Sequence, residues 1–244
     1  MLHWYRLIGA GSEGARTLER DGLVAALVPA SRARSVVNAV VYERPDSLVA
    51  AYDEIAAAYA EIGAKWTVWV HPGDLATAAL LKSMGHVLDA TPEAMAVDLV
   101  ATPPERPGRG ALEDFTADGS LPDVGAINDR AYDHGGDWFS RALAGLPEGE
   151  LHVYVARRDG EPVGCCVLVH QGANTEVQMV AVVPEARGEG IAGKLIAHGL
   201  ADAVERGART STLVATELGR PVYERLGFRP LGALEMWERR VDQR

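Results

Sequence analysis

The stretch that decides the fold is VAVVPEARGEGIAGK, residues 180–194. Its first four residues are apolar, mostly β-branched and stop at Pro184, which predicts a buried strand. Downstream, apolar residues at Ile191, Leu195, Ile196, Leu200, Ala203 and Val204 recur at helical spacing and predict a helix with one buried face. Between the two lies a turn that contains two glycines.

This turn has the properties of a phosphate-binding corner. Gly188 and Gly190 carry no Cβ, so the backbone can come close to a bulky group. The start of the helix offers unpaired N–H groups and the positive end of the helix dipole, and Arg187 and Lys194 add positive charge. These features favour an anion at this corner.

Three patterns place a strand, a glycine turn and a helix together, and spacing distinguishes them. A P-loop fits Gly188 to Lys194, but Leu195 stands where the Mg²⁺-binding hydroxyl belongs. A dinucleotide fingerprint needs a third glycine at a spacing that this turn does not keep. The third pattern, [RQ]-x-x-G-x-[GA] after a V-x-P strand end, is matched by residues 187–192 at every fixed position. Here the sequence resembles the GNAT superfamily of acyl-CoA-dependent N-acyltransferases.

The resemblance implies a set of cofactor contacts. In this family the strand before the turn binds the pantetheine arm of acetyl-CoA through its backbone, and the turn wraps the pyrophosphate with N–H groups. Carried over residue by residue, the pantetheine contacts are Val180, Ala181 and Val182. The pyrophosphate contacts are Arg187, Gly188, Gly190, Ile191, Ala192 and Gly193. Because backbone groups do most of this work, we expect bulky residues at the glycines to harm binding more than loss of the Arg187 side chain.

A second motif strengthens the resemblance. Residues 223–228, YERLGF, are similar to the Y-x-x-L-G-F segment of the family, in which the tyrosine often protonates the departing CoA thiolate. A phenol near the sulfur can give a proton as negative charge develops there. The resemblance therefore assigns Tyr223 as the catalytic acid, the other interpretation being a half-buried aromatic residue on a helix.

Amine acylation also requires a base, because an ammonium group has no lone pair. In several GNAT enzymes the base is a glutamate four residues before the strand segment that contacts pantetheine, and Glu176 keeps that spacing. The strand period of two predicts that residues 176, 178, 180 and 182 share one face. A solvated glutamate at a strand end is the alternative interpretation, and His170 is a weaker candidate base.

The acceptor side is expected between two early helices of the second half, at residues 132–139. Asp133, His134 and Asp137 could receive an amine there. The alternative, which we favour at this stage, is a polar loop in which Asp137 caps the following helix.

Composition narrows the class of protein. The 244 residues can bury one or two cores, and the net charge of −10 argues against broad nucleic-acid binding. No apolar run is long enough to span a bilayer and no signal peptide opens the chain, so we expect a cytoplasmic protein without a membrane partner.

Cys165 and Cys166 are adjacent in a strand pattern, which suits reduced core residues rather than a disulfide or metal site. We expect no metal.

The order of elements predicts an α/β chain with two tandem domains. Residues 101–110 hold three prolines and two glycines and form the expected linker between a domain over 1–100 and one over 111–244.

Residues 1–21 contain a formal G-x-G-x-x-G from Gly9 to Gly14 but no convincing strand and helix around it, so we expect a flexible turn in a helical lead-in. Strands are expected at 23–28, 36–41, 66–70, 93–100, 112–115, 151–156, 163–170, 176–183, 212–215 and 234–239. Helices are expected at 47–62, 74–84, 122–132, 137–146, 191–206 and 218–226. The resemblance implies the GNAT fold, a central mixed, mostly antiparallel sheet flanked by helices.

The halves also resemble each other. Residues 47–62 align with 191–206 without a gap, and LKSMGH at 81–86 falls on YERLGF at 223–228. At the glycine turn the first half has Glu43-Arg44-Pro45-Asp46, and Leu81 replaces the tyrosine. This copy has neither the N–H cradle nor the acid, so the chemistry is assigned to the second domain.

The sequence thus predicts an N-acetyltransferase that moves an acetyl group from acetyl-CoA to a primary amine by direct attack. The acceptor is a small-molecule amine or a peptide, and the protein is a monomer or a homodimer. Two alternatives stay open: a non-catalytic acyl-CoA-binding or regulatory protein, and a P-loop nucleotide binder.

Overall fold

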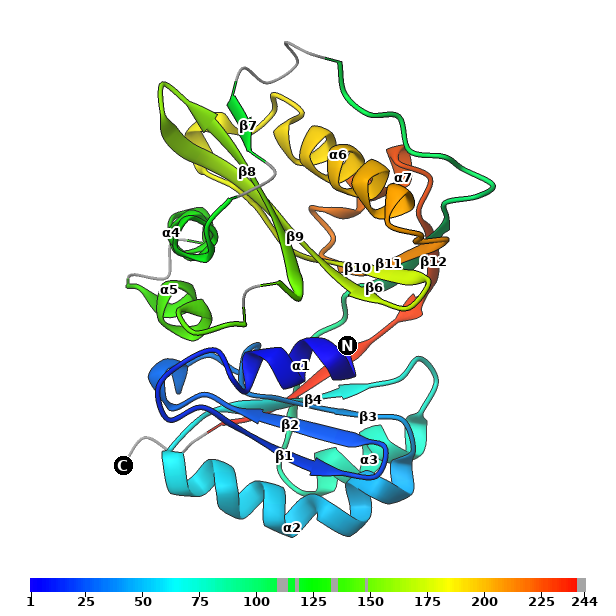
Figure 1. Cartoon of the computed structure of the whole chain (residues 1–244). Coiled ribbons are helices and arrows are strands. Elements are labelled where there is room, and N and C mark those ends of the chain that lie inside the picture. Colours follow the sequence, from blue (N-terminus) through cyan, green and yellow to red (C-terminus); the bar gives the residue numbers. More distant parts are fainter. Residues whose placement is uncertain (109–113, 117–118, 133–135, 148, 241–244) are drawn as a thin grey trace. The chain divides into compact units, whose positions relative to one another are not determined.

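A computed structural model describes residues 1–108, 114–116, 119–132, 136–147 and 149–240. The chain forms two compact units (Figure 1). Unit 1 comprises Met1–Pro92, Arg141–Leu146 and Ala233–Arg244, and unit 2 comprises Glu93–Ser140 and Pro147–Gly232. Each unit is built around one mixed sheet, as the sequence predicted.

Unit 1 holds a six-stranded sheet in the order β1-β2-β3-β4-β13-β5. All strand pairs are antiparallel except β3 with β4. The strands are β1 (Arg16–Arg20), β2 (Leu23–Leu27), β3 (Ala39–Tyr42), β4 (Trp66–Val70), β5 (Val87–Ala90) and β13 (Glu235–Arg239). Its helices are α1 (Leu2–Ile8), α2 (Pro45–Ile62) and α3 (Leu75–Ser83).

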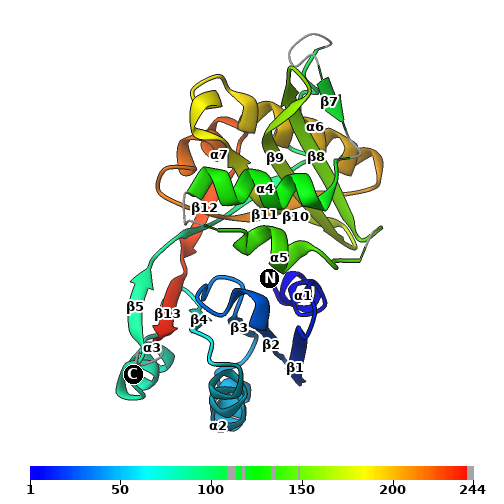
Figure 2. The ribbon, with the colours of Figure 1, turned by 90° about the vertical axis from the view of Figure 1, so that its left-hand side faces the viewer.

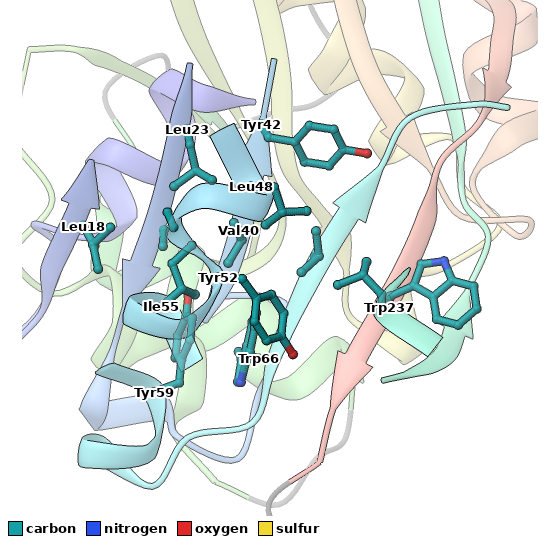
Figure 3. Close-up of a cluster of buried hydrophobic side chains, with 14 of the residues drawn as sticks. Leu18, Leu23, Val40, Tyr42, Leu48, Tyr52, Ile55, Tyr59, Trp66 and Trp237 are labelled. Carbon is teal, nitrogen blue, oxygen red and sulfur yellow. The ribbon is translucent and has the colours of Figure 1, made fainter. Parts of the chain in front are cut away.

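The core of unit 1 lies between this sheet and α2. Leu48, Ile55 and Tyr59 recur at helical spacing on α2 and are fully buried, as on the apolar face of an amphipathic helix. Tyr59 stacks on Trp66 of β4 with ring centroids 4.8 Å apart. Trp237 of β13 belongs to the same cluster (Figure 3), so the last strand of the chain helps to close this core.

Unit 2 holds a seven-stranded sheet in the order β12-β6-β11-β10-β9-β8-β7. The pair β10 and β11 is parallel, and β6–β11, β9–β10, β8–β9 and β7–β8 are antiparallel. The strands are β6 (Glu93–Asp98), β7 (Asp114–Thr116), β8 (Leu151–Arg158), β9 (Glu161–Gln171), β10 (Asn174–Val182), β11 (Thr210–Ala215) and β12 (Arg229–Ala233). The Asp159-Gly160 turn between β8 and β9 has positive φ at both residues, as expected for a D-G hairpin.

Helices cover the two faces of this sheet. The long helix α6 (Ile191–Glu205) packs on β8, β9 and β10, and α4 (Leu121–Tyr132) packs on the opposite face of the same strands (Figure 2). Residues directly opposite one another in a ladder share a face. Cys165 contacts Asn128 of α4, so the sheet face that carries Cys165 is called the α4 face. Leu168 lies beside Gly199 of α6, so the face that carries Leu168 is called the α6 face. The shorter α5 (Trp138–Leu143) and α7 (Arg220–Arg225) complete the α-helices of the described chain.

The two sheets share one plan, with an exchange of strands. In each half, a strand pairs in parallel with the strand that follows the long helix: β3 with β4, and β10 with β11. The last strand of each half then completes the other half's sheet. β13 lies between β4 and β5, and β6 lies between β11 and β12. The expectation that residues 93–100 close the first domain and 234–239 the second is therefore wrong, because an alternating strand pattern does not specify which sheet the strand joins.

Three further differences concern exposed strands. The expected helical lead-in with a turn is present as α1 and residues 9–14, but strand β1, which the sequence did not predict, follows it. Strands β5 and β12, which the sequence did not predict, are edge strands with mostly exposed side chains. Such strands lack the half-buried alternation from which strands are inferred. Within the described residues, no helix is both long and apolar enough to cross a membrane.

Candidate functional site

The candidate site lies where β10 separates from β11. Their parallel pairing runs from Asn174↔Thr210 to Val177↔Leu213 and goes no further. β10 continues to Val182, and Gln178, Met179, Val180 and Val182 are partly exposed. One edge of this strand is thus open over the segment that the resemblance assigned to pantetheine.

A β-bulge interrupts the other edge of β10. The pairing with β9 passes from Gln178↔Val167 to Ala181↔Cys165, which leaves one extra residue on β10. Met179 has φ of +51°, a left-handed conformation that is uncommon for a residue with a side chain. The bulge reverses the alternation beyond it, so Glu176 and Gln178 share the α4 face, whereas Val182 pairs with Gly164 on the α6 face. The prediction that residues 176, 178, 180 and 182 share one face is therefore wrong.

The glycine turn provides backbone amides. Residues 183–190 connect β10 to α6, and Gly188 and Gly190 have φ of +83° and +75°. A Cβ built on either glycine meets nothing within 4 Å. Among the described residues, no carbonyl accepts a hydrogen bond from the N–H groups of residues 188–193, whereas the next amide, Lys194 N–H, bonds to Gly190 O at 3.1 Å. These amides meet the N-terminus of a fifteen-residue helix, which favours an anion.

Arg187 supports the turn from within. Its guanidinium donates to the carbonyl of Val182 at 3.2 Å and to that of Ala131, at the end of α4, at 2.6 Å. These bonds fix the strand end to α4. The acidic residues of the turn are also paired, Glu185 with Arg130 and Glu189 with Arg158, which offsets negative charge beside an anion site.

Tyr223 lies on α7 with 8% of its surface exposed. Its ring contacts Phe228 edge-on at a centroid distance of 6.0 Å. Burial raises the pKa of this phenol, and the neighbouring Cys166 and Tyr132 raise it further. Within the described chain the hydroxyl makes no hydrogen bond. The side chain is thus a protonated acid whose proton is not committed to a protein acceptor.

Glu176 lies in the middle of the sheet, paired with Val169 on β9 and Thr212 on β11. Its side chain is buried, with 5% of the residue exposed, and Oε1 accepts a hydrogen bond from Gln178 Nε2 at 2.9 Å. The predicted juxtaposition of Glu176 and Gln178 is therefore present. The alternative interpretation, a solvated glutamate at a strand end, does not fit this burial.

The acceptor region is described in part, because Asp133 and His134 lie outside the described residues. Asp137 is exposed and precedes α5. The residue that caps α5 is Asp129, whose carboxylate accepts the N–H groups of Phe139 and Ser140 at 2.8 and 3.1 Å. Asp129 of α4 thus supplies the cap that the sequence assigned to Asp137. His170 lies on the α6 face of β9, opposite Thr175, and so points away from the face that carries Glu176.

The corresponding corner of unit 1 is closed. Only Glu43 and Arg44 connect β3 to α2, and Pro45 begins the helix. Glu43 N–H already donates to Gly22 O at 2.7 Å. At the strand end, His71 Nε2 bonds to Tyr42 O at 2.7 Å, and the Tyr42 hydroxyl donates to Asp74 at 2.8 Å. This corner lacks the long glycine turn, and Pro45 has no N–H to offer. Within the described residues, no group of three or more His, Cys, Asp or Glu side chains could hold a metal ion.

Comparisons with known proteins give one family match and several similar solved structures. The acetyltransferase (GNAT) domain family matches residues 149–230, and no curated protein matches the chain. A GCN5-related N-acetyltransferase from Kribbella flavida is similar in structure, with a TM-score of 0.65, 20% identity, and coverage of 97% of this chain and 92% of that one. A GCN5-related N-acetyltransferase from Sphaerobacter thermophilus is also similar, with a TM-score of 0.63, 19% identity, and coverage of 98% of this chain and 91% of that one.

A tandem GNAT protein from the clavulanic acid biosynthesis pathway is also similar, with a TM-score of 0.61, 17% identity, and coverage of 95% of this chain and 81% of that one. At these identities the structural likenesses show the fold. The family match spans β8 to β12, which includes the open strand edge, the glycine turn and Tyr223. Residues 149–230 of this chain therefore match the acetyltransferase (GNAT) domain family.

Proposed function

We propose that unit 2 binds acetyl-CoA and transfers its acetyl group to a primary amine. The observation that carries this proposal is the run of amides at residues 188–193, which have no acceptor among the described residues and include two glycines with open space around them. A diphosphate fits this arrangement because it needs several N–H donors and close backbone approach. Val180, Ala181 and Val182, on the open edge of β10, would hold the pantetheine arm.

In the proposed reaction, the amine nitrogen attacks the thioester carbon, a C–N bond forms, and the C–S bond breaks. The electron pair of that bond remains on sulfur, and the CoA thiolate takes the proton of Tyr223. This role is supported by a hydroxyl that keeps its proton at neutral pH and that, among the described residues, has no protein acceptor for it.

The attacking nitrogen must lose a proton before or during attack. Glu176 is proposed as the base, directly or through water. Support comes from its burial on the α4 face of β10, three residues before the bulge, and from Gln178, which orients its carboxylate. A positioned carboxylate of this kind typically contributes about 10²- to 10⁴-fold in rate.

Unit 1 is proposed to bind no cofactor, because its corner is short, its Glu43 amide is used, and Leu81, which aligns with Tyr223, is fully buried. The whole chain should therefore bind one acetyl-CoA. We propose this tandem arrangement as one working half and one degenerate half.

The function can be tested by calorimetry with acetyl-CoA, followed by a screen of small amines and peptide N-termini with free thiol as readout. Saturable binding of one acetyl-CoA and release of thiol with at least one acceptor would support the proposal. Binding without transfer to any acceptor would favour the regulatory alternative. Binding of Mg²⁺ and ATP in place of acetyl-CoA would contradict the assignment.

A further inference from the structure

The bulge of β10 is held by a thiol on the neighbouring strand. Cys165 is fully buried on β9, and its Sγ donates to the carbonyl of Met179 at 3.2 Å. The sulfur also receives a hydrogen bond from Asn128 Nδ2 at 3.3 Å. Asn128 lies on α4, is 2% exposed, and is anchored by a second bond from Nδ2 to Val124 O at 2.8 Å. A continuous chain of contacts thus runs from α4 through Cys165 to the bulge.

The bulge needs such support because its backbone is unfavourable. Met179 is one of two residues other than glycine with positive φ in the described chain, and the other, Asp159, lies in a hairpin turn. A left-handed conformation costs an ordinary side chain free energy that surrounding contacts must offset. At Met179 the sheet does not supply them, since this residue has no ladder partner on β9 or on β11.

The bulge also determines which backbone groups and side-chain faces of β10 are available at the site. Neither Met179 nor Val180 has a ladder partner on either edge. Cys165 occupies the carbonyl of Met179, so within the bulge the backbone groups of Val180 are the ones without a ladder partner or a bond to Cys165. If the extra residue were absorbed into a regular strand, Val180 would pair with Cys165 and the residues beyond it would change faces.

We infer that Cys165, oriented by Asn128, is a positioning residue that keeps the β10 bulge in the shape that receives the pantetheine arm. This inference rests on the proposed function for the identity of the ligand. It assigns a role to a side chain that composition alone suggests is an inert core thiol. Its neighbour Cys166 lies on the opposite face and is equally buried, and its thiol makes no hydrogen bond within the described chain.

The chemistry of the site suits a thiol that acts as a donor. Burial raises the pKa of Cys165 to about 12, although hydrogen bonds from the backbone of Ala181 and from Asn128 lower it in part. The thiol therefore keeps its proton at neutral pH and can donate it to Met179 O. A methyl group at this position would remove the donor, whereas a hydroxyl would retain it.

The test compares Cys165→Ala, Cys165→Ser and the control Cys166→Ala in the full-length protein. Calorimetry with acetyl-CoA gives the Kd of each, and hydrogen exchange measured by mass spectrometry reports on the backbone of residues 178–183. We expect Cys165→Ala to raise Kd about fivefold, the value of one ordinary hydrogen bond, and to speed exchange in this segment. Cys165→Ser should stay within about twofold of the natural protein on both measures, as should Cys166→Ala.

Equal effects of Ala and Ser at position 165 would overturn the inference, because packing rather than hydrogen bonding would then be responsible. Unchanged Kd and exchange in Cys165→Ala would overturn it as well. Should Cys165→Ala fail to fold, Cys165→Val fills the space without a donor and takes its place. If the natural protein binds no acetyl-CoA, the proposed function fails, and the exchange comparison still decides whether the thiol holds the bulge.

Discussion

Among single residues, Tyr223 gives the sharpest test of the proposed chemistry. Its hydroxyl has no hydrogen-bond partner in the described chain, so Tyr223→Phe removes a proton donor without breaking a protein contact. We expect kcat to fall on the order of 100-fold, while the KM for acetyl-CoA and the Tm stay close to their original values. Steady-state kinetics and a thermal melt check this. A similar loss in Phe228→Leu, which alters the ring packed against Tyr223, would indicate a packing role instead.

Glu176 is tested by the pH dependence of the rate. Glu176→Gln keeps the size of the side chain and its hydrogen bond to Gln178, but it removes the group that accepts the proton. We expect kcat/KM to fall on the order of 100-fold and the acidic limb of its pH profile to disappear. The control is Gln178→Leu, which removes the orienting donor and should retain the acidic limb. An unchanged profile in Glu176→Gln would remove this residue from the mechanism.

We expect the buried His86 to make unit 1 less stable in acid. It is buried, its Nδ1 bonds to the carbonyl of Trp237 at 3.0 Å, and its Nε2 bonds to the Tyr52 hydroxyl at 2.9 Å. A carbonyl only accepts, so Nδ1 carries the proton and Nε2 receives one from Tyr52. Burial lowers the pKa of His86 from 6.5 to about 4. The neutral ring therefore contributes stability that is fully present above pH 6.5 and is lost as the pH falls toward 4.

We expect His86 to account for a loss of about 3 kcal/mol in unfolding free energy between pH 7 and pH 4. Denaturant titrations of the natural protein and of His86→Gln over this range measure it. The variant should be less stable at pH 7 and should show a shallower decline. The lowered pKa values of His152, His170 and His198 act in the same direction, so part of the decline should remain. Parallel curves for the two proteins would contradict this account.

Residues of the site differ in how far the sequence could reveal them. The glycine turn was predicted from its spacing, because it depends on backbone freedom. Glu176 and Tyr223 were assigned by the resemblance to the GNAT family. Cys165, Asn128 and Met179 could not be found in this way, since they come together only after β9, β10 and α4 pack. A bulge is a slip of one residue in pairing, and a strand pattern has the same apolar character with or without it.

At the scale of elements, the strand–turn–helix unit can be tested by its glycines. Gly188, Gly190 and Gly160 all have φ near +80° and open space at the Cβ position. Alanine at each should therefore cost a similar amount of stability, about 1–2 kcal/mol. Only the first two adjoin the unpaired amides of residues 188–193. We expect Gly188→Ala and Gly190→Ala to weaken acetyl-CoA binding about tenfold or more, measured by calorimetry.

Gly160, in the β8–β9 turn, is the matched control for this pair. Gly160→Ala should bind acetyl-CoA normally despite its loss of stability. Equal weakening at all three positions would show that the glycines serve folding alone. Arg187→Ala should weaken acetyl-CoA binding by an amount between these cases. The substitution removes the bonds that tie the strand end to α4 but leaves the amides of the turn in place.

At the scale of the whole molecule, the exchange of β6 and β13 is what the sequence could not show. The internal repeat gave the order strand, helix, strand, helix that both halves share, as β3-α2-β4-α3 and β10-α6-β11-α7. It could not show that each half donates its last strand, because the face pattern of residues 93–98 suits either sheet equally. The linker inferred from its prolines therefore separates the two halves of the sequence and not the two units of the structure.

The exchange predicts how the chain responds to cutting. A protease site introduced near residue 104 leaves β6 on the first fragment and β13 on the second, so each fragment keeps a strand within the other's sheet. Such strands form ladder hydrogen bonds on both edges, which a fragment cannot replace with water inside a sheet. We expect the cleaved chain to run as one species in gel filtration and to keep its acetyl-CoA site.

A second cut position separates strand exchange from simple adhesion of two domains. Cleavage near the exposed Thr91, between β5 and β6, leaves β6 with its own sheet, so only β13 remains exchanged. This form should come apart at a lower denaturant concentration than the form cut near residue 104, because one inserted strand holds it in place of two. If both forms separate at the same concentration, or if the fragments part without denaturant, the exchanged strands do not hold the halves together.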